Sequence, residues 1–142
     1  MRTFDRIIAI SDVHGENEKF IELLKKTEYD PASDLLIVCG DLIDRGTQNL
    51  ETIRTCRKLQ QQGAILLKGN HEQFAEECIQ DMILERPSEA LQLWACHNGG
   101  SNTYDELINL SKDELKDLLS FIRRLPLYFA VDDYIFVQDR KS

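Results

Sequence analysis

Short runs of consecutive apolar residues lie in the first half of the chain and predict buried β-strands. They cover residues 7–10, 35–39 and 64–67. Continuous apolar runs of this length are typical of strands that are covered on both faces, as in a parallel sheet. The pattern therefore predicts a small sheet whose strands lie inside the molecule.

Between these runs the apolar residues recur with the spacing of an amphipathic helix. One set is Phe20, Leu23, Leu24 and Thr27, and the other is Leu50, Ile53, Cys56 and Leu59. Strands that alternate with helices form βαβ units, in which the strands are parallel and the crossovers right-handed. The fold class predicted for the first half is therefore α/β, with a βαβαβ core.

The second half of the chain predicts mainly helices. A helical pattern covers residues 74–84, and Pro87 can open a further helix at its first turn. Ser111 and Glu114 form a capping-box signature, and Pro126 ends the helix that follows it. One face of that helix carries Leu115, Leu118, Leu119, Ile122 and Leu125. Residues 134–137 predict a last strand, and no repeat or linker divides the chain, so we expect a single domain over residues 1–142.

The composition is acidic, with 25 Asp and Glu against 17 Lys and Arg in 142 residues and a net charge of −8. This charge argues against nucleic-acid or membrane partners, because no basic stripe can displace counterions. The first residues are charged where a signal peptide would be apolar, and no apolar run approaches the roughly 20 residues that span a bilayer. We therefore expect a cytoplasmic protein with reduced thiols, buried as small hydrophobes, at Cys39, Cys56, Cys78 and Cys96.

Polar, ionisable residues follow each of the three predicted N-terminal strands. The clusters are Asp12-Val13-His14-Gly15, Gly40-Asp41-Leu42-Ile43-Asp44-Arg45-Gly46 and Gly69-Asn70-His71-Glu72. Taken singly, each has a plain structural explanation as a turn, a local ion pair or a satisfied histidine. The carboxyl ends of parallel strands share one edge of the sheet, however, so all three clusters should converge on one crevice. Their coincidence favours a functional site.

The residue types in these clusters favour metal chemistry. Carboxylate, imidazole and amide ligands suit Mn, Fe or Zn, and the absence of thiolates from the set argues against a structural zinc. Asp12 and His14 are two residues apart and can point to the same side, while Asp41 from the neighbouring strand can bridge two ions. Bound cations would also let an acidic protein attract a phosphorylated substrate.

The three motifs resemble the signatures of the calcineurin-like metallophosphoesterases. The form is that of the PPP-type serine/threonine protein phosphatases, and it is most similar to the bacterial and phage-lambda type. Asn98-Gly99-Gly100, after a helix containing Trp94, resembles a further element of that group. The resemblance implies an α/β/β/α sandwich, of which this chain would hold only the N-terminal part.

The resemblance also implies roles for individual residues. Asp12, His14 and Asp41 resemble ligands of the first metal, with Asp41 bridging to a second ion that Asn70 also binds. His71 resembles the general acid, Asp44 the carboxylate that orients it, and Arg45 a phosphate clamp. Arg45, Asn70 and His71 would contact the substrate phosphate, and a metal-bound hydroxide would attack phosphorus in line.

The chain departs from the family pattern near its end. The family has a strand like residues 134–137 that ends in a metal-binding histidine, and here Gln138-Asp139-Arg140 stands in that place. The family binds two divalent metal ions, for which we expect Mn most readily. Because this ligand is missing, we expect the second metal site to be incomplete in this chain. A chain truncated or frameshifted after this strand would leave a sheet uncovered, so we also expect self-association.

Three functions follow as expectations. The first is metal-dependent hydrolysis of phosphoserine or phosphothreonine on proteins, because Asp44-Arg45-Gly46 and Glu72 fit the protein-phosphatase form better. The second is hydrolysis of dinucleoside polyphosphates such as diadenosine tetraphosphate by the same core. The third is a catalytically impaired chain that binds a metal or a phosphorylated partner. The substrate expected is a phosphorylated protein or a small phosphoester.

Overall fold

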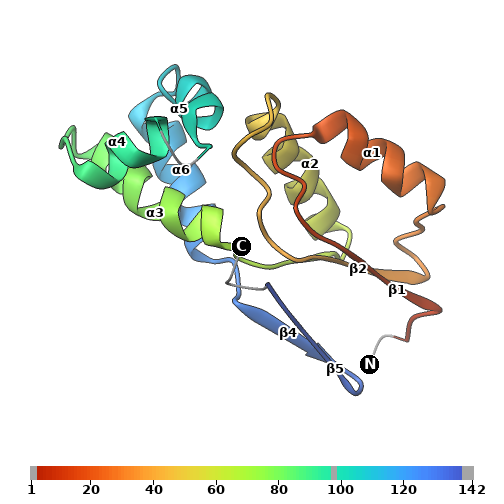
Figure 1. The fold of residues 1–142 in the computed structure, drawn as a ribbon. Coiled ribbons are helices and arrows are strands. Elements are labelled where there is room, and N and C mark those ends of the chain that lie inside the picture. The colour runs from red at the N-terminus through yellow and green to blue at the C-terminus, as the bar shows by residue number, and fades with distance from the viewer. Residues whose placement is uncertain (1–2, 97–98, 139–142) are drawn as a thin grey trace.

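A three-stranded parallel sheet forms the centre of the N-terminal half (Figure 1). The computed structural model describes residues 3–96 and 99–138. The strands are β1 (Arg6–Ile10), β2 (Asp34–Val38) and β3 (Ile65–Leu66), in the order β1-β2-β3. Ile8 lies opposite Leu36, and Val38 lies opposite Leu66. The α/β class and the parallel sheet predicted from the sequence are confirmed.

Strand β3 is shorter than the apolar run 64–67 predicted. The Leu67 N–H still donates to the Val38 carbonyl at 2.8 Å, which extends the contact with β2 beyond the strand itself. The next N–H, of Lys68, donates to the carbonyl of Pro126 at 2.8 Å instead. The chain therefore leaves the sheet at Lys68 because its backbone finds a partner in the C-terminal segment.

Helices α1 (Asn17–Lys26) and α2 (Asn49–Gln61) cross between the strands, as predicted (Figure 1). They pack on one face of the sheet, where Leu36 and Val38 belong to the main core cluster. The opposite face carries Leu35 and Ile37, which form a second cluster. All five residues of β2 are buried because both faces of this strand are covered.

Four helices form a second group: α3 (Asn70–Ile83), α4 (Glu89–Cys96), α5 (Ser101–Leu107) and α6 (Lys112–Arg123). The capping box of α6 is confirmed, since the Ser111 hydroxyl accepts from the Glu114 N–H at 3.1 Å and the Glu114 carboxylate accepts from the Ser111 N–H at 3.0 Å. The helix expected at Pro87 begins at Glu89. Helix α5 had no counterpart among the sequence predictions.

A β-hairpin follows α6 and lies against the face of the sheet away from α1 and α2 (Figure 1). Its strands are β4 (Tyr128–Val131) and β5 (Tyr134–Val137), which pair antiparallel with Phe129 opposite Phe136. Both phenylalanines pack against the second core cluster, whereas Tyr134 and Ile135 are 62% and 72% exposed. The strand predicted at residues 134–137 is confirmed, and β4 was missed.

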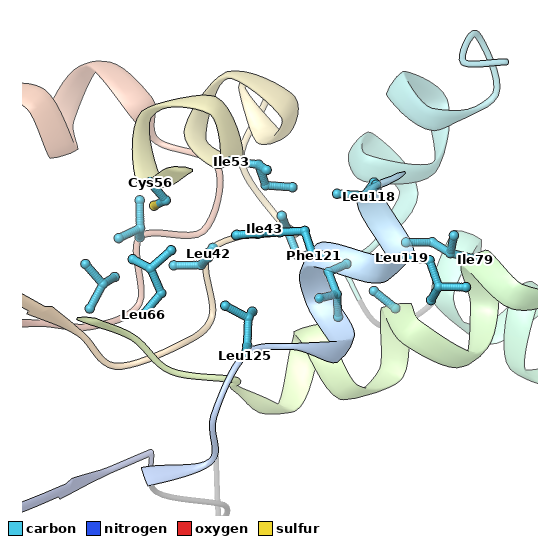
Figure 2. Packing of buried hydrophobic residues seen from close by; sticks show 14 of the residues in the cluster. Leu42, Ile43, Ile53, Cys56, Leu66, Ile79, Leu118, Leu119, Phe121 and Leu125 are labelled. Carbon is cyan, nitrogen blue, oxygen red and sulfur yellow. The ribbon is translucent and has the colours of Figure 1, made fainter. Parts of the chain in front are cut away.

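The loop that follows β2 joins the two halves of the molecule. Leu42 and Ile43 in this loop are each 1% exposed. Figure 2 shows Ile43 between Ile53 of α2 and Phe121 of α6. The polar segment that carries Asp41 and Asp44 is therefore anchored on both sides by apolar packing.

The four cysteines are free thiols. Burial was predicted correctly for Cys56 and Cys78, and it raises the pKa of each thiol to about 12. Cys96 is exposed, so the expectation of burial was wrong there, because it lies at the end of α4 outside the core. Among the described residues, no helix has the length and apolar character needed to cross a bilayer.

Candidate metal centre and active site

The three predicted polar clusters converge at the carboxyl edge of the sheet. The chain turns sharply there, and the residues with positive φ include Asp12 at 58°, His14 at 44°, Asp41 at 53° and Asp44 at 76°. Left-handed backbone is unfavourable for residues with a Cβ, and such strain is concentrated at functional sites. The turns are locked together by hydrogen bonds from the His14 N–H to the Asp41 carbonyl at 2.9 Å and from the Gly15 N–H to the Leu42 carbonyl at 2.8 Å.

Close contact between the first two clusters also explains why position 46 is glycine. A Cβ at Gly46 would lie 2.1 Å from the His14 carbonyl oxygen, closer than any side chain tolerates. Because Gly46 has no side chain, the loop after β2 can pack in direct contact with the loop after β1. His14 and Asp41 are brought together by this contact.

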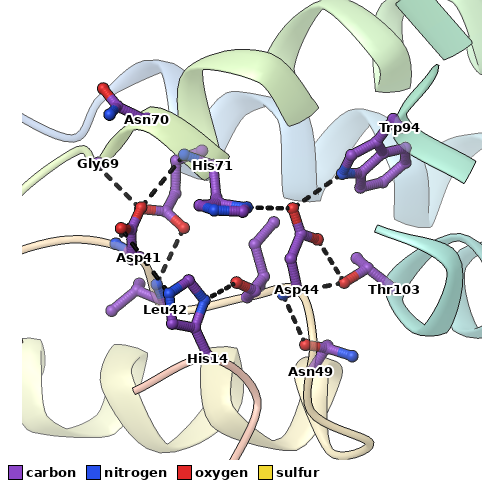
Figure 3. A network of polar contacts seen from close by, with 12 residues as sticks. His14, Asp41, Leu42, Asp44, Asn49, Gly69, Asn70, His71, Trp94 and Thr103 are labelled. Carbon is purple, nitrogen blue, oxygen red and sulfur yellow. Dashed lines mark hydrogen bonds and ion pairs between the residues drawn. The ribbon is translucent and has the colours of Figure 1, made fainter. Parts of the chain in front are cut away.

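His14, Asp41 and His71 form a compact group whose ligand atoms lie within 4.8 Å of one another. The Nε2 atom of His14 is 3.8 Å from Oδ2 of Asp41. The other ring nitrogen of His14, Nδ1, is 2.9 Å from the Ile43 carbonyl oxygen, which can only accept (Figure 3). The proton of a neutral His14 ring therefore lies on Nδ1, and the lone pair of Nε2 faces Asp41.

This arrangement fits a divalent metal ion. A histidine that donates one ring N–H to a backbone carbonyl and presents the other nitrogen beside a carboxylate has the usual environment of a metal ligand. Two ligands that each lie about 2.1 Å from an ion can be as far as about 4 Å apart, which accommodates the His14–Asp41 pair. The donor set of imidazole and carboxylate suits Mn, Fe and Zn.

His71 is held by a buried carboxylate. Its Nδ1 atom lies 2.7 Å from Oδ2 of Asp44, whose side chain is fully buried. The hydrogen bond to Asp44 raises the pKa of His71, against a smaller opposite effect of burial. Trp94 Nε1 also donates to Oδ2 of Asp44 at 3.0 Å, and the Thr103 hydroxyl donates to Oδ1 at 2.6 Å (Figure 3).

Glu72 ties the second and third clusters together. Its carboxylate accepts backbone N–H groups of Asp41 at 2.7 Å, Leu42 at 2.9 Å and Gly69 at 2.9 Å. Burial raises the pKa of Glu72 to about 7, although these donors act in the opposite direction. Glu72 therefore holds the loop that carries Asp41 against the start of α3, which carries His71.

The other residues proposed from the sequence lie at the edge of this group. Asp12 is exposed, and its carboxylate is not part of the His14–Asp41–His71 group. Asn70 is the first residue of α3, and Figure 3 shows its side chain pointing away from that group. Arg45 is exposed, and its backbone is fixed by the Gly99 carbonyl at 2.6 Å and by the Asn102 side chain at 3.0 Å.

Gln138 reaches the site from the end of β5. Its Oε1 atom accepts the N–H of Asn70, and its Nε2 atom is buried without a partner among the described residues. The position that the family resemblance assigns to a metal-binding histidine is thus close to the site and carries an amide. Asp139, Arg140 and Asn98 lie outside the described residues.

Trp94 and Thr103 were not assigned a role from the sequence. Both contact Asp44, yet they follow it by 50 and 59 positions, and neither belongs to a strand-end cluster. The sequence feature that could have pointed to Trp94 is its position before Asn98-Gly99-Gly100, a motif of the family. That motif does not show which residue the indole contacts.

A family description of calcineurin-like phosphoesterases matches residues 5–141. The chain belongs to the calcineurin-like phosphoesterase family. Its α/β architecture is similar to the fold that the strand-end motifs implied, with partial coverage of the matched structures.

Two curated relatives carry the same name, symmetrical bis(5'-nucleosyl)-tetraphosphatase. The one from Aromatoleum aromaticum is 30% identical over 132 residues, which are 92% of this chain and 42% of that protein. The one from Xanthomonas campestris pv. campestris is 44% identical over 64 residues, which are 45% of this chain and 19% of that protein. The chain therefore spans less than half the length of these relatives.

A solved structure of a cold-active protein tyrosine phosphatase has a similar fold. Its TM-score is 0.61 at 22% sequence identity, and the match covers 95% of this chain and 42% of the other. At that identity the likeness concerns the fold alone.

Proposed function

We propose that this chain carries the N-terminal half of the active site of a metal-dependent phosphoester hydrolase, and that its substrates are dinucleoside polyphosphates such as diadenosine tetraphosphate. The observation that carries the reaction class is the His14–Asp41–His71 group beside the buried Asp44. The substrate class is supported by the relatives from two organisms that are named as symmetrical bis(5'-nucleosyl)-tetraphosphatases.

These relatives favour dinucleoside polyphosphates over the phosphoproteins that we expected first. That expectation depended on Asp44 and Glu72, and the structure gives a physical reason why the two residues discriminate poorly between substrates. Asp44 is 0% exposed and Glu72 is 1% exposed, and both are occupied by hydrogen bonds within the site. With almost no exposed surface, neither side chain is available to contact a leaving group directly.

His14 and Asp41 would hold a metal ion, with Asp12 as a further ligand by family resemblance. When bound, the ion would polarise a phosphoryl oxygen and so favour attack on phosphorus. The guanidinium of Arg45, exposed beside the site, would pair with the polyphosphate, for which its planar donors are suited.

His71 would supply a proton to the leaving oxygen. Its Nδ1 is engaged with Asp44, so Nε2 is the nitrogen that remains for the substrate. The raised pKa of His71 favours the doubly protonated ring that can donate from this atom. Symmetrical hydrolysis of a dinucleoside tetraphosphate adds one water across the central P–O–P bridge and yields two nucleoside diphosphates.

The test is hydrolysis by the full chain, first stripped of metal and then supplied with Mn²⁺, Fe²⁺ or Zn²⁺. Diadenosine tetraphosphate, a phosphoserine peptide and an aryl phosphate are compared, and products are separated by anion exchange. We expect metal-dependent release of ADP that is at least a hundredfold weaker in Asp41→Asn and in His71→Asn. The exposed Asp117→Asn serves as the matched control and should retain activity.

Faster turnover of the phosphoserine peptide than of diadenosine tetraphosphate would overturn the substrate class. Activity that persists in both Asp41→Asn and His71→Asn, or that does not depend on metal, would overturn the proposed site.

A further inference from the structure

The Asp44 carboxylate is held by three helices at once. His71 is on α3, Trp94 is on α4 and Thr103 is on α5, and each side chain contacts one of the two carboxylate oxygens (Figure 3). Oδ2 lies 2.7 Å from His71 Nδ1 and 3.0 Å from Trp94 Nε1, while Oδ1 lies 2.6 Å from the Thr103 hydroxyl. Asp44 itself is 0% exposed, so water does not compete for these bonds.

The chemistry of the donors determines the direction of each bond. An indole N–H can only donate, so Trp94 requires Oδ2 to be an acceptor. The Thr103 oxygen accepts the backbone N–H of Asp44 at 3.1 Å, and its single hydroxyl proton is then directed to Oδ1 at 2.6 Å. Rotation of the carboxylate would break both bonds, so the oxygen that faces His71 is fixed in place.

We infer that Trp94 and Thr103 are positioning residues, which orient Asp44 so that His71 keeps a proton on Nδ1 and presents Nε2 to the substrate. Their catalytic importance rests on the proposed hydrolase function, whereas their effect on His71 does not. The inference also explains why α4 and α5 pack beside the strand-end clusters although neither helix contributes to the His14–Asp41–His71 group.

The surroundings of Trp94 fix the indole in turn. Trp94 is 1% exposed, and its ring packs edge-on against Tyr104 with the ring centres 6.5 Å apart. A Cβ at position 100 would lie 2.3 Å from Trp94 Cδ1, so glycine at this position leaves room for the indole. The donor that Trp94 offers to Asp44 is therefore fixed before any substrate arrives.

Helix α5 fixes the backbone of Asp44 as well as its side chain. Glu106, one turn after Thr103, accepts the backbone N–H groups of Asn49 and Leu50, each at 3.0 Å. The side chain of Asn49 accepts the Asp44 N–H at 2.9 Å. One turn of α5 thus contacts both Asp44 and the start of α2. Asp44 and the start of α2 are therefore coupled, because movement of either one strains the hydrogen bonds of the other.

The test compares variants that remove one donor with little change of shape. Trp94→Phe removes the indole N–H, Thr103→Val removes the hydroxyl, and Thr103→Ser restores it. Thr52→Val is the matched control, because Thr52 of α2 is as buried as Thr103 but donates to the carbonyl of Gln48, the residue before that helix. Each full-length variant is studied without metal by ¹⁵N NMR of the histidine ring nitrogens at alkaline pH, and His71→Asn identifies the resonances.

We expect the unaltered chain and Thr103→Ser to hold His71 as the Nδ1–H form, and Trp94→Phe and Thr103→Val to contain a mixture with the Nε2–H form. Thr52→Val should keep the unaltered pattern even if it lowers stability. In the metal-loaded hydrolase, the same two variants should lower kcat about ten- to a hundredfold with little change in KM, and Thr103→Ser should restore it.

A folded Thr103→Val or Trp94→Phe with unaltered His71 ring shifts would overturn the inference, and so would an equal change in Thr52→Val. If either variant fails to fold, Asp44→Asn provides a second measurement, since it should shift both the Trp94 indole N–H resonance and the His71 ring resonances. Loss of hydrolysis in the unaltered chain would overturn the proposed function while the NMR result still decides the positioning role.

Discussion

Individual residues at the site are strained and buried in ways that local sequence does not reveal. Asp12 and His14 were expected to point to the same side because they are two positions apart. That rule applies to extended backbone, whereas both residues have positive φ. The structure accordingly places His14 in the compact group and Asp12 outside it, and the role of Asp12 as a ligand stays a prediction.

Glu72 is the residue whose structural importance is most open to test. We expect Glu72→Gln to lower the free energy of unfolding by about 1–3 kcal/mol, because the amide turns an N–H group toward backbone donors that need an acceptor. Urea denaturation followed by circular dichroism measures this change. Glu77→Gln, on the exposed face of the same helix, is the control and should be nearly neutral. Equal stability of the two variants would contradict the role assigned to Glu72.

Elements that the sequence marks by an apolar run or a helix cap agree with the structure, although β1, which we expected to lie inside the molecule, is only partly buried. Strands β1 and β2 lie within one residue of the apolar runs, and α6 begins at the predicted capping box. Strand β4 was missed because its four residues directly follow Pro126 and Leu127 and alternate between exposed and half-buried. Helix α5 was missed because its seven residues follow a glycine pair and carry few apolar side chains.

The contribution of the junction of β1, β2 and α1 to the stability of the protein should depend on pH. Arg6 donates to Asp34 at 2.8 Å and 3.1 Å and to the Thr27 carbonyl at 2.9 Å, near the end of α1. The hydrogen bond from Arg6 holds the pKa of Asp34 below its ordinary value. A carboxyl whose pKa is lower in the folded state contributes stability above its unfolded pKa of about 3.9, and this contribution is lost as the pH falls further.

We therefore expect Asp34→Asn to lower the melting temperature at neutral pH. Below about pH 4, the melting temperature of this variant should fall less steeply with decreasing pH than that of the unaltered chain. Thermal melts across the acid range measure this effect. Asp105→Asn, exposed on α5, should leave the shape of the profile unchanged. A parallel decline in Asp34→Asn and in the unaltered chain would show that the Arg6–Asp34 pair does not contribute.

At the scale of the whole molecule, the buried loop after β2 and hydrogen bonds between α5 and the start of α2 join the sheet with α1 and α2 to the second group of helices. Ile43 of that loop lies between α2 and α6 (Figure 2). The same loop carries Asp41 and Asp44, so the site lies where the two groups meet. The hairpin adds Phe129 and Phe136 to the other face of the sheet but leaves large apolar side chains exposed. These include Tyr128, Tyr134, Ile135 and Val137.

Self-association through an uncovered sheet stays a prediction, and Ile135→Lys tests whether the exposed side of this hairpin mediates it. We expect the unaltered chain to associate with increasing concentration in sedimentation velocity, and Ile135→Lys to associate less because a charge then replaces a side chain that is 72% exposed. Gln61→Lys, exposed at the end of α2, adds the same charge elsewhere and should not alter association. A chain that stays monomeric at all concentrations would contradict the prediction.

The sequence by itself determined the parallel sheet and the convergence of three polar clusters at its edge. Both follow from the spacing of apolar residues and from the lengths of the apolar runs, which are local properties of the chain. It also determined the family, since the motifs lie together at strand ends. Only the tertiary structure decided which oxygen of Asp44 faces His71, that Trp94 and Thr103 hold it, and that Gln138 reaches Asn70. These contacts join residues 27 to 68 positions apart, and such pairings depend on how helices pack, which no local pattern specifies.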